Sequence, residues 1–175
     1  PNSVYLPDSP RVDPALFRQG VPVLGICYGI QTMAHLLGGH VTTPENQEYG
    51  RTDTWYATDS LLFQGLPDRG ISWMSHTDYV DRLPEGFRAT ARTATTPVAA
   101  MECREKGFYG LQFHPEVLHT ENGCAMLRNF LYRVCGAVGD WTMEDFARTA
   151  VERLRERIGD KRVMLALSGG VDSSV

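Results

Sequence analysis

The sequence VPVLGICYGIQTMAHLLGG, from Val21 to Gly39, passes from an apolar run through a Gly-x-Cys-x-Gly turn into a second apolar pattern. The short run from Val21 to Ile26 is typical of a buried parallel strand. After Tyr28 the apolar residues recur with helical spacing until Gly38 and Gly39 end the pattern. The stretch therefore predicts a strand, a tight turn and a helix, with Cys27 at the corner.

Such a corner suits a nucleophile. A strand that turns sharply into a helix holds its corner side chain outward, and the flanking Gly25 and Gly29 would relieve the crowding behind it. The helix N-terminus favours a thiolate, so we expect a Cys27 pKa below the ordinary value. The N–H of Tyr28 is a candidate oxyanion donor. A structural cysteine in a tightly packed turn is the alternative.

A partner base is found in LQFHPEV, from Leu111 to Val117. On an extended segment His114 and Glu116 point to the same side, because side chains alternate with a period of two. A carboxylate beside an imidazole fixes its tautomer and stabilises its charged form. Cys27, His114 and Glu116 are thus candidates for nucleophile, general acid/base and orienting group. His76, in WMSHTD, is either a binding-site residue or has no role there.

The remaining elements follow the same rules. Residues 1–14 predict a loop and PALFRQG a short helix, while residues 40–113 have the composition of sheet, with a hairpin turning at Glu105 to Gly107. A helix is expected from Glu121 to Cys135, with its apolar side formed by Met126, Leu127, Phe130, Leu131 and Val134. After a linker, Thr142 and Asp145 resemble a capping box that opens an amphipathic helix. A second buried strand is expected from Arg162 to Leu167.

Composition limits the class of protein. The 175 residues are 42% hydrophobic and 22% charged, with a formal net charge of −4. These values are ordinary for a globular protein, and we expect neither a nucleic acid nor a membrane as partner. The four cysteines form no CxxC pair, which favours a reducing compartment such as the cytoplasm.

The chain ends in a second motif, SGGVDSSV. Glycines in a turn between a strand and a helix let backbone N–H groups approach phosphate oxygens, and serine hydroxyls add donors. The turn has no lysine and is not a Walker A loop. Asp172 would position Mg²⁺ or cap the helix. The candidate phosphate ligands, which the resemblance described below assigns to ATP and pyrophosphate, are Ser168, Gly169, Gly170, Val171, Asp172, Ser173 and Ser174.

GICYGIQ together with FHPEV resembles the class I (triad-type) glutamine amidotransferases, from Pro1 to about Val138. The resemblance implies an α/β fold of the flavodoxin-like kind, an open mixed and largely parallel sheet flanked by helices. It implies that Cys27 attacks the side-chain amide of glutamine and releases ammonia through a glutamyl thioester. Gln31 matches the position that helps hold the substrate, and the glutaminase half needs no cofactor.

SGGVDSS resembles the pyrophosphate loop of the N-type ATP pyrophosphatases, and the order of the two motifs is similar to that in the GMP synthase family. WMSHTD also resembles a segment of that family, which usually has Ser-His-Gly-Asp, so Thr77 is a departure. The resemblance implies that ATP, with Mg²⁺, adenylates xanthosine monophosphate and that ammonia then displaces AMP to give GMP.

The organisation that follows is an amidotransferase domain over residues 1–138 and the first helix and strand of an ATP pyrophosphatase domain over residues 139–175. We expect both to be truncated, because the chain begins at Pro1 and ends inside the second motif. A homodimer that forms through a region beyond Val175 is a further possibility. Two alternative functions also fit the sequence: an amidotransferase or related cysteine hydrolase with another acceptor, and a non-catalytic domain of the same fold.

Overall fold

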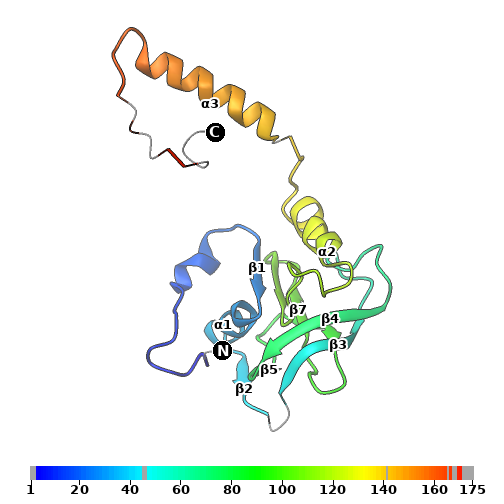
Figure 1. The fold of residues 1–175 in the computed structure, drawn as a ribbon. Coiled ribbons are helices and arrows are strands. Elements are labelled where there is room, and N and C mark those ends of the chain that lie inside the picture. The colour runs from blue at the N-terminus through cyan, green and yellow to red at the C-terminus, as the bar shows by residue number, and fades with distance from the viewer. Residues whose placement is uncertain (1–2, 45–46, 141, 165, 167–168, 171–175) are drawn as a thin grey trace. The chain divides into compact units, whose positions relative to one another are not determined.

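The computed structural model describes residues 3–44, 47–140, 142–164, 166 and 169–170. The chain divides into two compact units, Pro1–Ala137 and Val138–Val175. The first unit is built on a six-stranded sheet (Figure 1). From edge to edge its strands are β1 (Val23–Ile26), β8 (Phe108–Leu111), β7 (Ala100–Cys103), β6 (Arg88–Arg92), β3 (Glu48–Tyr56) and β4 (Arg69–His76).

The sheet is mixed, as expected for the α/β class. Strands β1 and β8 are parallel, whereas the other neighbouring pairs in the described sheet, β8–β7, β7–β6, β6–β3 and β3–β4, are antiparallel. The sheet was expected to be largely parallel, and parallel pairing is found at its β1 edge, between β1 and β8. The short turn between β7 and β8 favours antiparallel pairing of these two strands, whereas the parallel strands β1 and β8 are joined by a long crossover. The predicted hairpin is β7–β8, which turns at residues 104–107.

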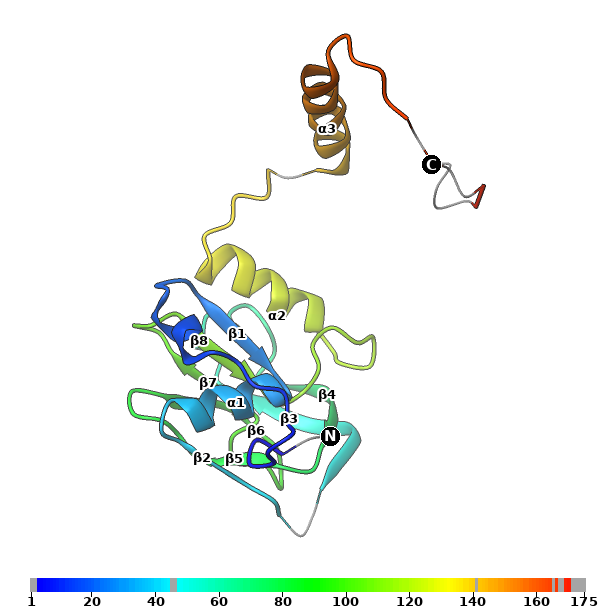
Figure 2. The same cartoon turned by 90° about the vertical axis from the view of Figure 1, so that its left-hand side faces the viewer.

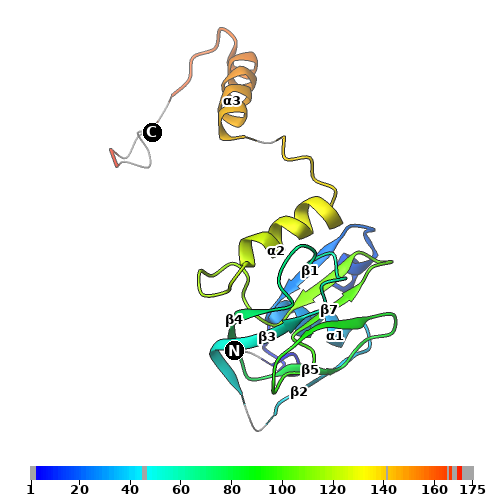
Figure 3. The same ribbon diagram turned by 90° about the vertical axis from the view of Figure 1, so that its right-hand side faces the viewer.

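Helices cover both faces of this sheet, as the views from the two sides show (Figures 2 and 3). Helix α1 (Tyr28–Leu36) contributes Ile30, Met33 and Ala34 to one core cluster. Helix α2 (Gly123–Asn129) and the π-helical turn η2 (Phe130–Val134) pack Met126, Phe130 and Val134 against the other. The predicted helix 121–135 is thus present, but Leu131 is 51% exposed rather than on the buried side.

Two smaller elements complete the first unit. The predicted short helix is the 3₁₀ helix η1 (Pro14–Arg18), capped by the side chain of Asp13. Strands β2 (His40–Thr42) and β5 (Tyr79–Arg82) pair antiparallel in a separate two-stranded sheet. Val41 and Val80 from this pair join the core cluster of α1. The segment between β4 and β5, residues 77–78, is thereby held beside α1.

A pair of glycines lets α1 lie close to the sheet. Gly25 of β1 is directly opposite Gly110 of β8 in the parallel register. A Cβ at Gly110 would lie 2.5 Å from Cγ1 of Ile30, and one at Gly25 would lie 2.7 Å from the backbone carbonyl carbon and oxygen of Gly29. Only residues without a Cβ allow this approach of the helix.

The second unit contains α3 (Met143–Ile158), the predicted amphipathic helix. Its capping box is formed, because the hydroxyl of Thr142 accepts from the N–H of Asp145 at 3.1 Å. The predicted strand 162–167 is wrong for residues 162–164 and 166, which are not in a strand. A strand is stabilised by hydrogen bonds to a neighbour, and this unit offers no second strand among its described residues. Nor is any described helix of the whole chain long and apolar enough to cross a membrane.

Candidate active site

Cys27 occupies the sharp corner between β1 and α1. Its backbone has φ 51° and ψ −105°, and only Asn122 shares a positive φ among the non-glycine residues described. Such a conformation costs on the order of 1–3 kcal/mol and persists only where neighbours enforce it. Here the N–H of Cys27 donates to the carbonyl of Leu111 at 2.7 Å, which ties the corner to the end of β8. The predicted elbow is therefore present.

The two flanking glycines differ in what they do. Gly25 is needed for the close approach of the helix, whereas a Cβ at Gly29 would meet nothing within 4 Å. Steric crowding therefore explains why residue 25 is a glycine, but it does not explain the glycine at position 29.

The electrostatics of the thiol differ from the expectation. Burial raises the pKa of Cys27, the backbone N–H of Tyr28 lowers it, and the nearby Glu116 carboxylate raises it again, with burial the largest effect. The prediction of a lowered pKa was wrong because desolvation outweighs the helix N-terminus. The Sγ atom also lies 3.7 Å from the carbonyl oxygen of Ser75, an acceptor that a thiol can use and a thiolate cannot.

His114 and Glu116 form the predicted pair. His114 Nδ1 lies 2.7 Å from Glu116 Oε1. Because a carboxylate only accepts, Nδ1 carries the proton and Nε2 is left to exchange one. The segment after β8 is irregular rather than extended, and its position is fixed by backbone contacts. The N–H of His114 donates to the carbonyl of Trp73 at 3.1 Å, and Thr120 Oγ1 donates to the carbonyl of His114 at 2.5 Å.

Cys27 and His114 both line one cavity of about 500 Å³. Its volume falls within the range of small-molecule sites. Glu116 does not line it and lies behind His114. The lining residues are Pro10, Ile26, Cys27, Tyr28, Gln31, Ser75, His76, Thr77, Asp78 and His114.

The predicted substrate-binding residues lie in the wall of this cavity. The Gln31 amide is buried, and its Nε2 donates to the carbonyl of Asp78 at 2.6 Å and to Gln112 Oε1 at 3.3 Å. Tyr28 donates its hydroxyl to the carbonyl of Pro10 at 2.9 Å. Its backbone N–H donates separately to the sulfur of Cys27. Thr77 needs no glycine-like conformation, since its φ is not positive, and its hydroxyl lies 3.0 Å from that of Tyr49.

Two residues of this region were missed by the sequence analysis. Gln112 is fully buried and its Nε2 lies 3.9 Å from Cys27 Sγ. Glu48, the first residue of β3, is buried with its Oε2 at 3.3 Å from Nε2 of His76. Two features of the sequence were available for Glu48, its inward position on a strand and the threonine-rich segment 93–96. Neither indicates that Glu48 contacts His76 or these threonines.

The second motif does not assemble a site in the described part of the chain. Ser168, Val171, Asp172, Ser173 and Ser174 lie outside the described residues. Gly169 and Gly170 lie in a bend, and Gly169 has φ 78°. Their role in binding ATP or pyrophosphate stays a prediction.

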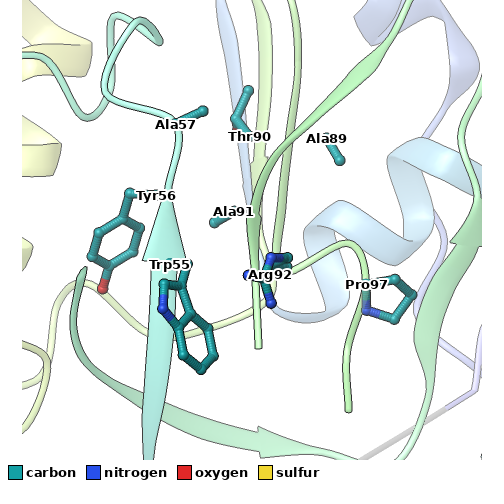
Figure 4. A pocket seen from close by; sticks show the side chains of 8 residues that line it. All are labelled: Trp55, Tyr56, Ala57, Ala89, Thr90, Ala91, Arg92 and Pro97. Atoms are coloured by element: carbon teal, nitrogen blue, oxygen red, sulfur yellow. The ribbon is translucent and has the colours of Figure 1, made fainter. Parts of the chain in front are cut away.

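A separate cavity of about 240 Å³ lies at the junction of β3 and β6 (Figure 4). The guanidinium of Arg92 stacks on the ring of Trp55 at 4.7 Å. The lining lacks a thiol, an imidazole and a carboxylate, so this cavity offers no nucleophile or base for attack on an amide. It is lined by Trp55, Tyr56, Ala57, Ala89, Thr90, Ala91, Arg92 and Pro97.

Comparison with known proteins agrees with this geometry. The family described as glutamine amidotransferase class-I matches residues 1–134. The chain is 53% identical over its whole length to the glutamine-hydrolysing GMP synthases of Clostridium botulinum (strain Alaska E43) and of Carboxydothermus hydrogenoformans, and it covers 34% of each. It thus spans about a third of the length of these relatives.

A solved structure is also similar. A protein of Thermoplasma acidophilum, described as a subunit of GMP synthase, superposes with a TM-score of 0.66 at 30% identity. The match covers 79% of this chain and 64% of the other.

Proposed function

Because the chain belongs to the class-I glutamine amidotransferase family, we propose that its Cys27 cavity hydrolyses the side-chain amide of glutamine and supplies ammonia for the synthesis of GMP. The observation that carries the proposal is the pairing of a strained corner cysteine with the His114–Glu116 pair around one cavity. The names of the relatives support the acceptor, xanthosine monophosphate, since both are glutamine-hydrolysing GMP synthases.

The first half of the reaction forms a thioester. Cys27 Sγ attacks the amide carbon of glutamine while its proton passes to His114 Nε2. The oxyanion that develops accepts from the N–H of Tyr28, which already points at the sulfur. His114 then returns the proton to the departing nitrogen and ammonia leaves, with Glu116 stabilising the imidazolium in between.

The second half restores the enzyme. His114 Nε2 takes a proton from water, whose oxygen attacks the thioester carbon. The carbon–sulfur bond breaks, the proton returns to Sγ and glutamate is released. Because burial raises the pKa of Cys27, the thiol rests in its protonated form, and His114 generates the nucleophile during the reaction.

The acceptor half belongs to the remainder of the protein. ATP, with Mg²⁺, would activate xanthosine monophosphate by adenylation, and the ammonia would displace AMP. The residues expected to hold the pyrophosphate, Ser168 to Ser174, include only Gly169 and Gly170 among those described. A cytoplasmic location suits these soluble substrates and the four free cysteines.

The test uses the intact protein that contains this chain. Pyrophosphate release from ATP is followed with glutamine or with ammonium, in the presence and absence of xanthosine monophosphate. We expect Cys27→Ala to abolish the glutamine-dependent reaction and to spare the ammonium-dependent one. The exposed Cys124 provides the matched control, and Cys124→Ala should retain both.

Other outcomes would identify a different function. Glutamine hydrolysis without nucleotide-dependent pyrophosphate release would keep the amidotransferase and discard the acceptor. Failure of a glutamine-like electrophile to label Cys27 would favour a non-catalytic domain.

A further inference from the structure

A buried carboxylate lies behind the cavity without lining it. Glu48 is 8% exposed, and its two oxygens receive hydrogen bonds from the turn at residues 93–96. Oε1 accepts from the hydroxyls of Thr93, at 2.5 Å, and Thr95, and Oε2 accepts from that of Thr96 at 2.8 Å. Burial tends to raise the pKa of Glu48, but the contacts from His76 and the three threonines lower it to about 2. The group is therefore a carboxylate at neutral pH.

The imidazole of His76 lies between two acceptors. It is 1% exposed, its Nδ1 lies 3.1 Å from the carbonyl oxygen of Asp78, and its Nε2 lies 3.3 Å from Glu48 Oε2. The Glu48 contact is an ion pair by distance, although the ring N–H is not aligned for a hydrogen bond. Neither oxygen can donate, so a neutral ring would set one nitrogen lone pair against an oxygen lone pair. An imidazolium avoids this repulsion and pairs its charge with the Glu48 carboxylate.

The same segment contacts the reacting sulfur and the cavity wall. The carbonyl of Asp78 receives the N–H of His76 and the Gln31 amide, the latter at 2.6 Å. One residue before His76, the carbonyl of Ser75 lies 3.7 Å from Cys27 Sγ. Holding His76 thus fixes two carbonyl groups that face catalytic and substrate-binding side chains.

We propose that Glu48 is a positioning residue for the reaction at Cys27: it holds His76 as an imidazolium, which fixes the 75–78 segment against Gln31 and the sulfur. The inference rests on the proposed function for its catalytic consequence. Glu48 acts only through His76, since it does not line the cavity. The threonines let the carboxylate stay charged while buried, which an unpaired carboxylate could not do without a large penalty.

Glu48→Gln in the intact protein tests the proposal, because it removes the charge and keeps the shape. Its amide can donate to Nε2, so His76 should then hold a proton on Nδ1 alone. Selective ¹⁵N labelling of histidine, with His76→Gln for assignment, reports the protonation of both nitrogens. We expect two ring protons on His76 in the wild type at neutral pH and one in Glu48→Gln.

The kinetic readout is kcat/KM for glutamine, with ammonium-dependent activity as a reference for the acceptor half. In Glu48→Gln the buried contacts of residue 48 change from charge-assisted to neutral, which predicts a fall of about tenfold to a hundredfold. Glu102→Gln is the matched control, since Glu102 is an equally buried strand carboxylate that instead binds Arg88, Arg104 and Ser60. It should change neither the His76 spectrum nor the glutamine kinetics.

Two results would overturn the proposal: a single ring proton on His76 in the wild type, or glutamine kinetics in Glu48→Gln equal to those of Glu102→Gln. If the wild type itself failed to hydrolyse glutamine, the proposed function would fall together with the catalytic consequence. The ring-nitrogen spectra would still decide whether Glu48 holds His76 as an imidazolium.

Discussion

Replacing Gly25 with alanine should destabilise the fold by forcing α1 away from β1. The new Cβ would lie 2.7 Å from both the carbonyl carbon and oxygen of Gly29 and 2.9 Å from the nitrogen of Ile30. Carbon atoms in contact prefer about 3.5–4.0 Å, so the helix must move by roughly 1 Å. The clashing atoms are backbone and cannot be relieved by a rotamer change.

Overpacking costs about 1–3 kcal/mol, and rigid backbone contacts favour the upper end. The loss of unfolded-state entropy from glycine to alanine offsets up to about 1 kcal/mol. The net loss in the free energy of unfolding is therefore about 2 kcal/mol. Urea denaturation of the 175-residue chain, followed by tryptophan fluorescence, measures it.

The matched control is Gly29→Ala, which places a Cβ in open space within α1. Alanine is the better helix former by about 1 kcal/mol, so this variant should be as stable as the wild type or more so. The steric reasoning would be refuted if Gly25→Ala unfolded with the wild-type free energy, or if Gly29→Ala were the more destabilised of the two.

Two further predictions concern titrating groups. Burial and, to a smaller extent, Glu116 raise the pKa of Cys27, so Glu116→Gln should move the midpoint of Cys27 alkylation by iodoacetamide to lower pH and should also slow glutamine hydrolysis. The exposed Cys124 and Cys135 are first changed to serine so that only Cys27 is followed. An unmoved midpoint would contradict the effect assigned to Glu116. The pKa of Glu48 is about 2 in the fold, below the unfolded value of about 4.3, so its stabilisation is complete above that value and is lost as the pH falls toward 2. Urea denaturation between pH 6 and 3 should show about 2 kcal/mol of this dependence disappear in Glu48→Gln, because pH 3 lies about 1.3 units below the unfolded pKa; parallel curves for the two proteins would argue against it.

The local parts of the fold could be predicted from the sequence. The strand, corner and helix around Cys27 depend on signals only a few residues apart, namely an apolar run, two glycines and a change of period. The β7–β8 hairpin and the capping box at Thr142 are similarly local. Each of these elements is present at its predicted place.

Contacts between distant strands could not be predicted. The pairing of β3 with both β6 and β4 is set by the packing of the whole sheet, and no residue pattern in β3 indicates its neighbours. Residues 162–164 show the reverse case, since their apolar pattern has no partner strand among the described residues of the second unit and they do not form a strand. Strand propensity describes a fit to a pleated surface that other segments must supply.

The candidate site divides in the same way. The contact between His114 and Glu116 could be predicted because the two residues are neighbours in the chain. Glu48 reaches His76 only because β3 and β4 pair with these two residues in register. Gln112 approaches Cys27 because β8 lies parallel to β1. Residues brought together by sheet register were the ones the sequence analysis missed.

The raised pKa of Cys27 changes how the proposed reaction must begin. A thiolate stabilised in advance by the helix N-terminus would attack without help and would also react with oxidants and alkylating agents. A thiol that is partly buried and donates toward the Ser75 carbonyl stays protonated until a base removes its proton. In the proposed reaction that base is His114, and the Glu116 charge that disfavours the thiolate also favours the imidazolium formed with it. Burial is thus the main cause that keeps the resting thiol protonated, and the Glu116 carboxylate both adds to this effect and supports the ion pair through which the proposed reaction proceeds.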